Sequence, residues 1–405
     1  MGMKKYISSE RPNLFEPNVY ISMIVKMVGN IKKKDVAGAV GIAYSKNEAT
    51  MSKIVMEENG DAYYEKMDSS GCKIYVDNRD WQSIIHESEK RTFAIDKGEF
   101  VRTYIIEGKE EITLLIMAHH LVGDGKSILN LVQDIADVLA GKNVEYKPML
   151  LIDTKYLAER AKLPLGVKVA VKKLNKKWKK IGQAFTWKDY YSVHKQYWNN
   201  HYSDVKIETF DVKELKENVI RTCQGGITLN SYLITALLQK FPEHKVIGIP
   251  VSIREKNKGM SNQTSGIAIK HQFQQSLTFK KNAAEVHKKI YSKLKSAMQK
   301  YFVLLFISQL SPTLIDSVLL NTHGCYQNKL AQKMAYIMGY AENGGRDLGV
   351  TNLGKIDIPS EYRNFKITDI LFIPPKISYS KKVVGICTYG DNLHVSFHEM
   401  VGEEE

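Results

Sequence analysis

The stretch that decides the fold is MAHHLVGDG, residues 117–125. The apolar run of residues 112–118 leads into it, and such a run is typical of a buried strand at the centre of a sheet. From Ser127 to Leu139, apolar residues recur at helical spacing, which predicts an amphipathic helix. The histidines and Asp124 are therefore expected in a turn between a strand and a helix, where α/β folds often place reactive groups.

Adjacent residues of a strand point to opposite faces, so His119 and His120 are not expected to enter one cleft together. One is expected to do chemistry and the other to be packed. Asp124 is expected to brace the turn, with Gly123 and Gly125 supplying positive φ angles. An imidazole held by its neighbours is a good general base, because its unperturbed pKa lies near physiological pH.

Residues 119–125 match the pattern His-His-x-x-x-Asp-Gly. The chain thereby resembles the chloramphenicol-acetyltransferase-like acyltransferases, which include condensation domains of nonribosomal peptide synthetases and alcohol acetyltransferases. The resemblance implies that His120 removes a proton from an acceptor hydroxyl or amine. It implies that Asp124 is structural and ion-paired with an arginine, and that Gly125 keeps the entrance open.

The resemblance also implies an α/β fold with mixed sheets. Two chloramphenicol-acetyltransferase-like subdomains would lie in a pseudo-dimeric arrangement around a central tunnel. We expect residues 1–185 to form the N-terminal subdomain, which carries the motif and a basic crossover helix, and residues 186–405 to form the C-terminal one. A chain of 405 residues exceeds the usual size of a single core, which agrees with two halves.

Two later segments resemble the same superfamily. Residues 250–254, PVSIR, are similar to its Pro-Val-x-Leu-Arg-like segment, and residues 352–354 are similar to its Asn-Leu-Gly segment. Thr351 or Asn352 could donate a hydrogen bond to an oxyanion, although an ordinary turn is the alternative. The candidate partners of Asp124 are Arg102, one strand away, and Arg254.

The chain departs from condensation domains of peptide synthetases in two respects. Residues 86–92, HESEKRT, are only a distorted form of their Arg-His-Glu-x-Leu-Arg-Thr stretch. No carrier or adenylation domain is attached, and the Asp-Phe-Gly-Trp segment of plant-type transferases is not visible. A free-standing acyltransferase is therefore expected.

The composition is that of a globular protein, with 43% hydrophobic and 25% charged residues. Four scattered cysteines indicate reduced thiols rather than a disulfide framework, and no signal peptide is visible, so a cytoplasmic location is expected. These cysteines are Cys72, Cys223, Cys325 and Cys387.

Residues 160–180 contain eight lysines and one arginine without any acid, and so carry nine of the +14 formal charges. Apolar residues including Trp178 fall on one face of a helix expected over residues 160–181. Such a helix could lie on an anionic membrane surface or bind an acidic partner, while a solvated crossover is an equal alternative. The lysines would also suit the phosphates of coenzyme A or an acyl carrier protein. Nucleic acid is not expected, because no aromatic platform or reader module accompanies the charge.

The expected function is transfer of an acyl group from a thioester, acyl-CoA or an acyl carrier protein, to a hydroxyl or amine. No tightly bound cofactor is expected. No metal is expected either, because the strand pleat separates the histidines and no Cys or Glu cluster stands nearby. A P-loop is excluded, since the pattern requires glycine where His120 stands. The alternatives are a non-catalytic docking module of the same fold and a thioester hydrolase.

Overall fold

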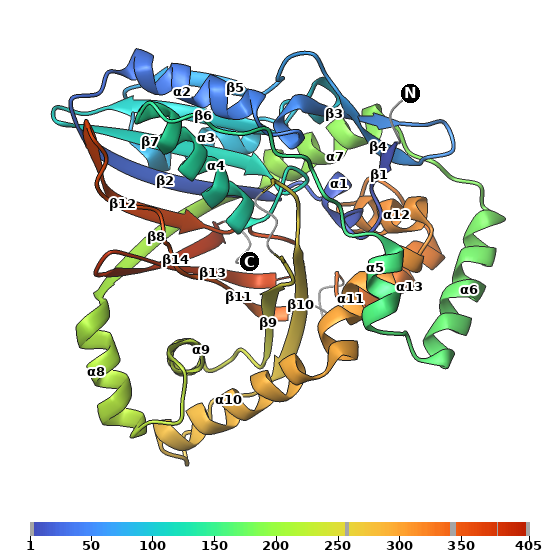
Figure 1. Ribbon diagram of the computed structural model, residues 1–405. Coiled ribbons are helices and arrows are strands. Elements are labelled where there is room, and N and C mark those ends of the chain that lie inside the picture. The colour runs from blue at the N-terminus through green and yellow to red at the C-terminus, as the bar shows by residue number, and fades with distance from the viewer. Residues whose placement is uncertain (1–3, 256–258, 341–345, 379, 402–405) are drawn as a thin grey trace.

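The strand that leads into the motif lies at the centre of a five-stranded sheet in the computed structural model, which describes residues 4–255, 259–340, 346–378 and 380–401 (Figure 1). The strand order is β12-β2-β7-β6-β5. β7 pairs with β2 and β6, and its side chains from Ile112 to His119 are all buried. The apolar run before the motif is thus explained by burial on both faces. The strands are β2 (Tyr20–Gly29), β5 (Lys73–Asp77), β6 (Val101–Glu107), β7 (Glu111–His119) and β12 (Phe365–Ile373).

Helices α2, α3 and α4 pack on this sheet. The predicted helix after the motif is α4, and Asp124 caps it by accepting a 2.9 Å hydrogen bond from the backbone N–H of Ser127. Asp80 caps α3 in the same way. The elements of this part of the chain are α1 (Pro12–Phe15), α2 (Lys33–Ser45), α3 (Trp81–Lys90), α4 (Gly125–Leu139) and α7 (Trp187–Asn200), the 3₁₀ turns Ala49–Met51 and Ile95–Lys97, and a small sheet of β1 (Lys5–Tyr6), β3 (Ser52–Met56) and β4 (Ala62–Lys66).

The second large sheet has six strands in the order β10-β9-β11-β13-β14-β8. β11 runs parallel to both β9 and β13, and the other pairs are antiparallel, so this sheet is mixed. The first sheet is mixed too, because β5 runs parallel to β6. Helices α8, α9 and α10 contribute to its core on one side. The elements are β8 (Tyr202–Asp211), β9 (Val246–Ser252), β10 (Thr264–Lys270), β11 (Arg346–Lys355), β13 (Ser380–Tyr389), β14 (Asn392–Val401), α8 (Val212–Cys223), α9 (Leu229–Lys240) and α10 (Phe279–Lys295).

The expected division between residues 185 and 186 does not separate the two sheets. β12 comes from the second part of the chain but pairs antiparallel with β2 in the first sheet, where Figure 1 shows it in red beside the blue strand. Arg11 also forms a buried ion pair with Asp316, with Nε 2.7 Å from Oδ1. The halves are interlocked because the second part of the chain supplies a strand to the first sheet and a buried ionic partner to Arg11.

His394 and His398 are structural residues. Both are buried where β14 faces the chain of β12. Nε2 of His394 lies 2.7 Å from Asp369 Oδ1, and Nδ1 of His398 lies 2.7 Å from the carbonyl of Pro374. These contacts join β14 of the second sheet to β12 of the first sheet and to the residue that follows β12.

The basic segment differs from the expected single helix over residues 160–181. It forms two helices, α5 (Thr154–Arg160) and α6 (Leu165–Lys179), because Pro164 stands at the start of α6 and cannot continue a helix from α5. Trp178, on the expected apolar face, is buried inside the protein, and its Nε1 donates to Thr313 Oγ1 at 2.7 Å. Thr313 belongs to α12 (Pro312–Thr322), which follows α11 (Ala297–Gln309) and precedes α13 (Lys329–Met338).

Within the described ranges, no single helix is long and apolar enough to cross a membrane, and the pair α11 and α12, which would suffice jointly, is bent by 98°.

Candidate functional site

The side chains of His119 and His120 lie in different environments at the end of β7, as the pleat of the strand predicts. His119 is fully buried, and its Nδ1 accepts a 3.2 Å hydrogen bond from the backbone N–H of Leu121. Burial holds the pKa of His119 well below its usual value. His120 is half-buried and lines a large cavity, so it is the histidine of the pair that a ligand can reach.

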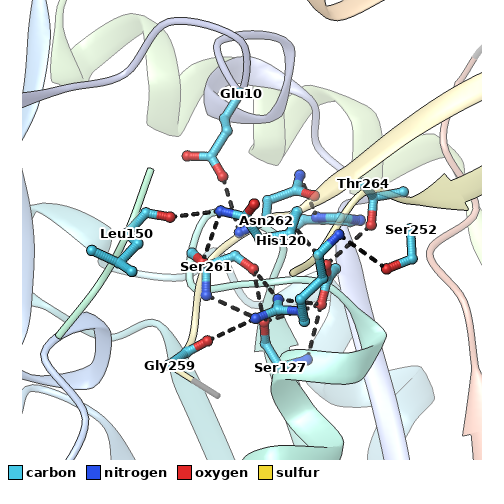
Figure 2. A network of polar contacts seen from close by, with 12 residues as sticks. Glu10, His120, Ser127, Leu150, Ser252, Gly259, Ser261, Asn262 and Thr264 are labelled. Atoms are coloured by element: carbon cyan, nitrogen blue, oxygen red, sulfur yellow. Dashed lines mark hydrogen bonds and ion pairs between the residues drawn. The ribbon is translucent and has the colours of Figure 1, made fainter. Parts of the chain in front are cut away.

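The ring of His120 is held through Nδ1, which lies 3.2 Å from the side-chain amide nitrogen of Asn262 (Figure 2). The ring also contacts its own backbone carbonyl. An amide nitrogen only donates, so a proton on Nδ1 requires the Asn262 amide to be turned over, with its Oδ1, which has no other hydrogen-bond partner in the described part of the chain, accepting from Nδ1. Among the residues that the structure describes, none forms a hydrogen bond to Nε2. Burial lowers the pKa of His120 below 6.5, more than the charge of Asp124 and this backbone contact raise it. The ring is therefore neutral at pH 7, and Nε2 is available to a substrate in the tautomer that carries its proton on Nδ1.

The carboxylate of Asp124 is fully used in joining three segments. Its Oδ1 accepts from Arg254 Nη2 at 2.9 Å as well as from Ser127, and its Oδ2 accepts from the backbone N–H of Gln263 at 2.9 Å and from Thr264 Oγ1 at 3.1 Å. Burial alone would raise its pKa, but Arg254 and the backbone donors outweigh this and hold the pKa of Asp124 below 3.8. Asp124 thus stays ionised and binds the motif turn to the segment between β9 and β10.

Arg102 does not pair with Asp124, contrary to one of the two expectations. It projects from β6 towards the end of α3, where its Nε donates to Glu99 at 2.6 Å and its Nη1 to the carbonyl of Ser88 at 2.8 Å. Its side chain is completely buried there. The guanidinium is occupied by the acceptors of a helix end, so Arg254 alone of the two candidates meets the motif.

Gly125 is required for space, not for a positive φ angle, which only Gly123 of the two motif glycines adopts. A Cβ at position 125 would lie 2.7 Å from Cδ2 of Leu353 and 3.3 Å from Phe372. Both neighbours line the cavity. A side chain at Gly125 would therefore push on the cavity wall.

Thr351 and Asn352 both lie on β11 at the cavity. The side chain of Asn352 is already engaged: its Nδ2 donates to Asn230 at 3.0 Å, and its Oδ1 accepts from the backbone of Gly354 at 2.8 Å. Asn352 therefore takes part in an ordinary turn in this structure, which is the alternative to a role at the oxyanion. A role of Thr351 towards an oxyanion stays a prediction.

Two residues that the sequence did not reveal stand next to His120. Asn262 contacts the ring directly, and Glu10 accepts from the backbone of Asn262 at 3.2 Å and from the hydroxyl of Tyr64 at 3.1 Å. Burial raises the pKa of Glu10 to about 8, so it holds its proton at pH 7. Neither residue lies in a recognisable pattern, because both reach the motif only through the tertiary fold.

The cavity that these residues share has a volume of about 780 Å³ and is lined from both sheets. This volume is in the range of pockets that enclose small organic ligands. Apart from Tyr340, its ionisable side chains, Glu10, Asp124 and Lys126, belong with His120 to the region around the motif. Among the described residues, no group of three or more His, Cys, Asp or Glu side chains could hold a metal ion.

Comparison with solved structures shows the same fold throughout the chain. Polyketide synthase associated protein 5 from Mycobacterium tuberculosis is 12% identical, with a TM-score of 0.62 over 99% of this chain and 93% of the other. The first condensation domain of the CDA synthetase is 10% identical, with a TM-score of 0.62 over 98% and 91%. A trichothecene 15-O-acetyltransferase from Fusarium sporotrichioides is 11% identical, with a TM-score of 0.62 over 97% and 89%.

A search of curated proteins by sequence found no match. Residues 15–362, however, match the family model of the condensation domain. This range includes the motif turn, Asn262 and Arg254, and thus most of the site described above. The chain belongs to the condensation-domain family.

Proposed function

We propose that this protein is an acyltransferase that moves an acyl group from a thioester donor to a hydroxyl or amine, with His120 as the general base. The observation that carries the proposal is a neutral imidazole whose Nε2 has no protein partner among the described residues and whose ring lines the cavity. Membership of the condensation-domain family supports a condensation or acyl-transfer role. The name of the trichothecene acetyltransferase, a structural neighbour, supports an oxygen acceptor.

In the proposed reaction, the acceptor attacks the carbonyl carbon of the thioester while its proton passes to Nε2 of His120. The resulting tetrahedral oxyanion then collapses, the carbon–sulfur bond breaks, and the imidazolium returns the proton to the leaving thiolate. No acyl-enzyme forms. Holding both reactants in one cavity supplies much of the acceleration, since it replaces an encounter in solution by a step within the complex.

Asp124 acts through position in this proposal. Its carboxylate does not hydrogen-bond to the ring in the described structure, but it holds Gln263 and Thr264, the neighbours of Asn262. Asn262 in turn contacts Nδ1. The ion pair with Arg254 thus keeps the side chain that orients the base in place.

Replacing the base should remove most of the turnover. For His120→Ala we expect release of free thiol from acyl thioesters to fall about 10²–10⁴-fold, the usual contribution of a general base. His86→Ala, which changes a histidine at a separate surface pocket, is the control and should match the parent. Unchanged turnover in His120→Ala would refute the role of His120 as the base. Thiol release by the parent that needs no acceptor would indicate a thioester hydrolase. No turnover by the parent with any pair of donor and acceptor would indicate a docking module.

Removing the charge of Asp124 should destabilise the fold. In Asp124→Asn the Arg254 guanidinium, with 7% of its side chain exposed, stays buried opposite a neutral amide, which costs about 3–5 kcal/mol. Urea unfolding measures this loss. Asp137→Asn breaks the ion pair with the exposed Lys142 and should change stability little. Equal stability of Asp124→Asn and the parent would show that the ion pair does not hold the site together.

The pH dependence should identify which cavity group is the base. Because burial places the pKa of His120 below 6.5 and the base must be neutral, kcat/KM should decline only below that pH. The Glu10→Gln variant should keep this acid limb. If Glu10 were the base, the rate would instead rise through pH 8, where its carboxyl ionises, and Glu10→Gln would abolish it.

We also propose that α6 brings the protein to an anionic membrane surface. All eight lysines between residues 160 and 180 are exposed, together with Leu165 and Val169. Such a surface combines charge attraction with apolar insertion.

Co-sedimentation with vesicles tests the contact. The parent should bind vesicles that contain phosphatidylglycerol and not those of phosphatidylcholine alone. Replacing Lys172, Lys176 and Lys179 by Gln should weaken binding about tenfold or more. The same exchange at the exposed Lys281, Lys288 and Lys295 of α10 is the matched control. An equal loss of vesicle binding in both triple variants would show that only the net charge of the protein matters and would contradict a specific role of α6.

A further inference from the structure

The cavity continues away from His120 across one face of the second sheet. Gly248 and Pro250 of β9, Gly266 of β10 and Gly349 of β11 all line it. The strand register places Gly349 opposite Gly248 and Gly266 opposite Pro250, so these residues form one continuous patch. Glycine inside a strand commonly marks a place where a ligand approaches the backbone closely. Here the glycines leave a smooth wall without side chains.

Three helices form the rest of this arm of the cavity. Val167 and Leu174 come from α6, Phe302 and Phe306 from α11, and Ile337 and Met338 from α13. The rings of Phe302 and Phe306 are stacked, with an interplanar angle of 5°. None of the lining residues on these three helices carries a charge. We call this region, between the glycine patch and the three helices, the apolar arm.

The cavity is thus divided chemically along its length. Ionisable groups lie near His120. The lining helices of the apolar arm contact an aliphatic ligand but offer no charged partner to a charged ligand group. A ligand with a polar reactive end and an unbranched hydrocarbon tail satisfies both regions.

We propose that the apolar arm binds the aliphatic chain of the acyl donor, so that the thioester of a medium-length or long fatty acyl group lies at His120. This inference rests on the proposed function, whose site it extends. The apolar face of α6 borders the arm and its lysines face solvent. A chain of lipid character would therefore enter beside the lysine-rich helix α6.

Gly266 offers a way to shorten the arm. A Cβ at this position would meet no other atom closer than the carbonyl oxygen of Ile249 at 4.0 Å, so a side chain can extend into the cavity. At Gly349, by contrast, a Cβ would contact Ser380 and Val383 at 3.4–3.5 Å. Leucine at position 266 should therefore occupy the arm without disturbing the strand pairing.

The test is calorimetric titration of hexanoate, decanoate and tetradecanoate into the protein. The parent should bind each longer acid more tightly, by about fourfold per added methylene, until the arm is filled. Gly266→Leu should bind tetradecanoate at least tenfold more weakly and leave hexanoate unchanged. Gly41→Leu, the same exchange where a Cβ meets nothing on exposed α2, should behave as the parent.

His120→Ala should retain the binding series, so the apolar arm is tested independently of the base. Affinity in the parent that does not grow with chain length would overturn the proposal, whether or not Gly266→Leu folds. So would unchanged tetradecanoate binding in a folded Gly266→Leu. A chain-length preference found only for alcohol acceptors of an acetyl thioester would overturn the assignment to the donor. Turnover of short thioesters would survive either result, which separates this proposal from the proposed function.

Discussion

The site depends on the ion pair between Asp124 and Arg254. The aspartate follows β7, the central strand of one sheet, and the arginine follows β9 of the other. A buried carboxylate that accepts from Arg254, Ser127, Gln263 and Thr264 fixes these segments in one relative position. Removing either charge would break this buried ion pair at a high cost in stability, which is why the junction has little freedom. Asn262 lies within the segment so fixed, and the base is oriented from there.

Other contacts also tie the two parts of the chain together. β12 completes the first sheet from the second part of the chain, and Asp316 neutralises Arg11 from a distance of 305 residues in the sequence. His394 and His398 tie β14 to the residues of β12 and just beyond it. A cavity between two such interlocked sheets keeps its shape, because neither sheet can shift without breaking contacts in the other.

The sequence predicted the elements that carry a strong local pattern. The apolar run before His119 and the amphipathic helix after Asp124 are both present in the structure. It did not predict β12 as a partner of β2, because strand patterns specify burial and not the neighbour. It divided the basic segment wrongly, although Pro164 gave a local reason for a break. The choice between Arg102 and Arg254 could not be made from spacing, since both are far from Asp124 along the chain. Glu10 and Asn262 carry no local signal at all.

The central claim is that His120 presents an unprotonated Nε2 to the cavity at pH 7. Nitrogen-15 NMR of the histidine-labelled protein observes both ring nitrogens, and comparison with His120→Ala assigns the signals. The account predicts a neutral His120 at pH 7, with the proton on Nδ1 and titration only below pH 6.5. A positively charged ring at pH 7, or a neutral ring with its proton on Nε2, would contradict it.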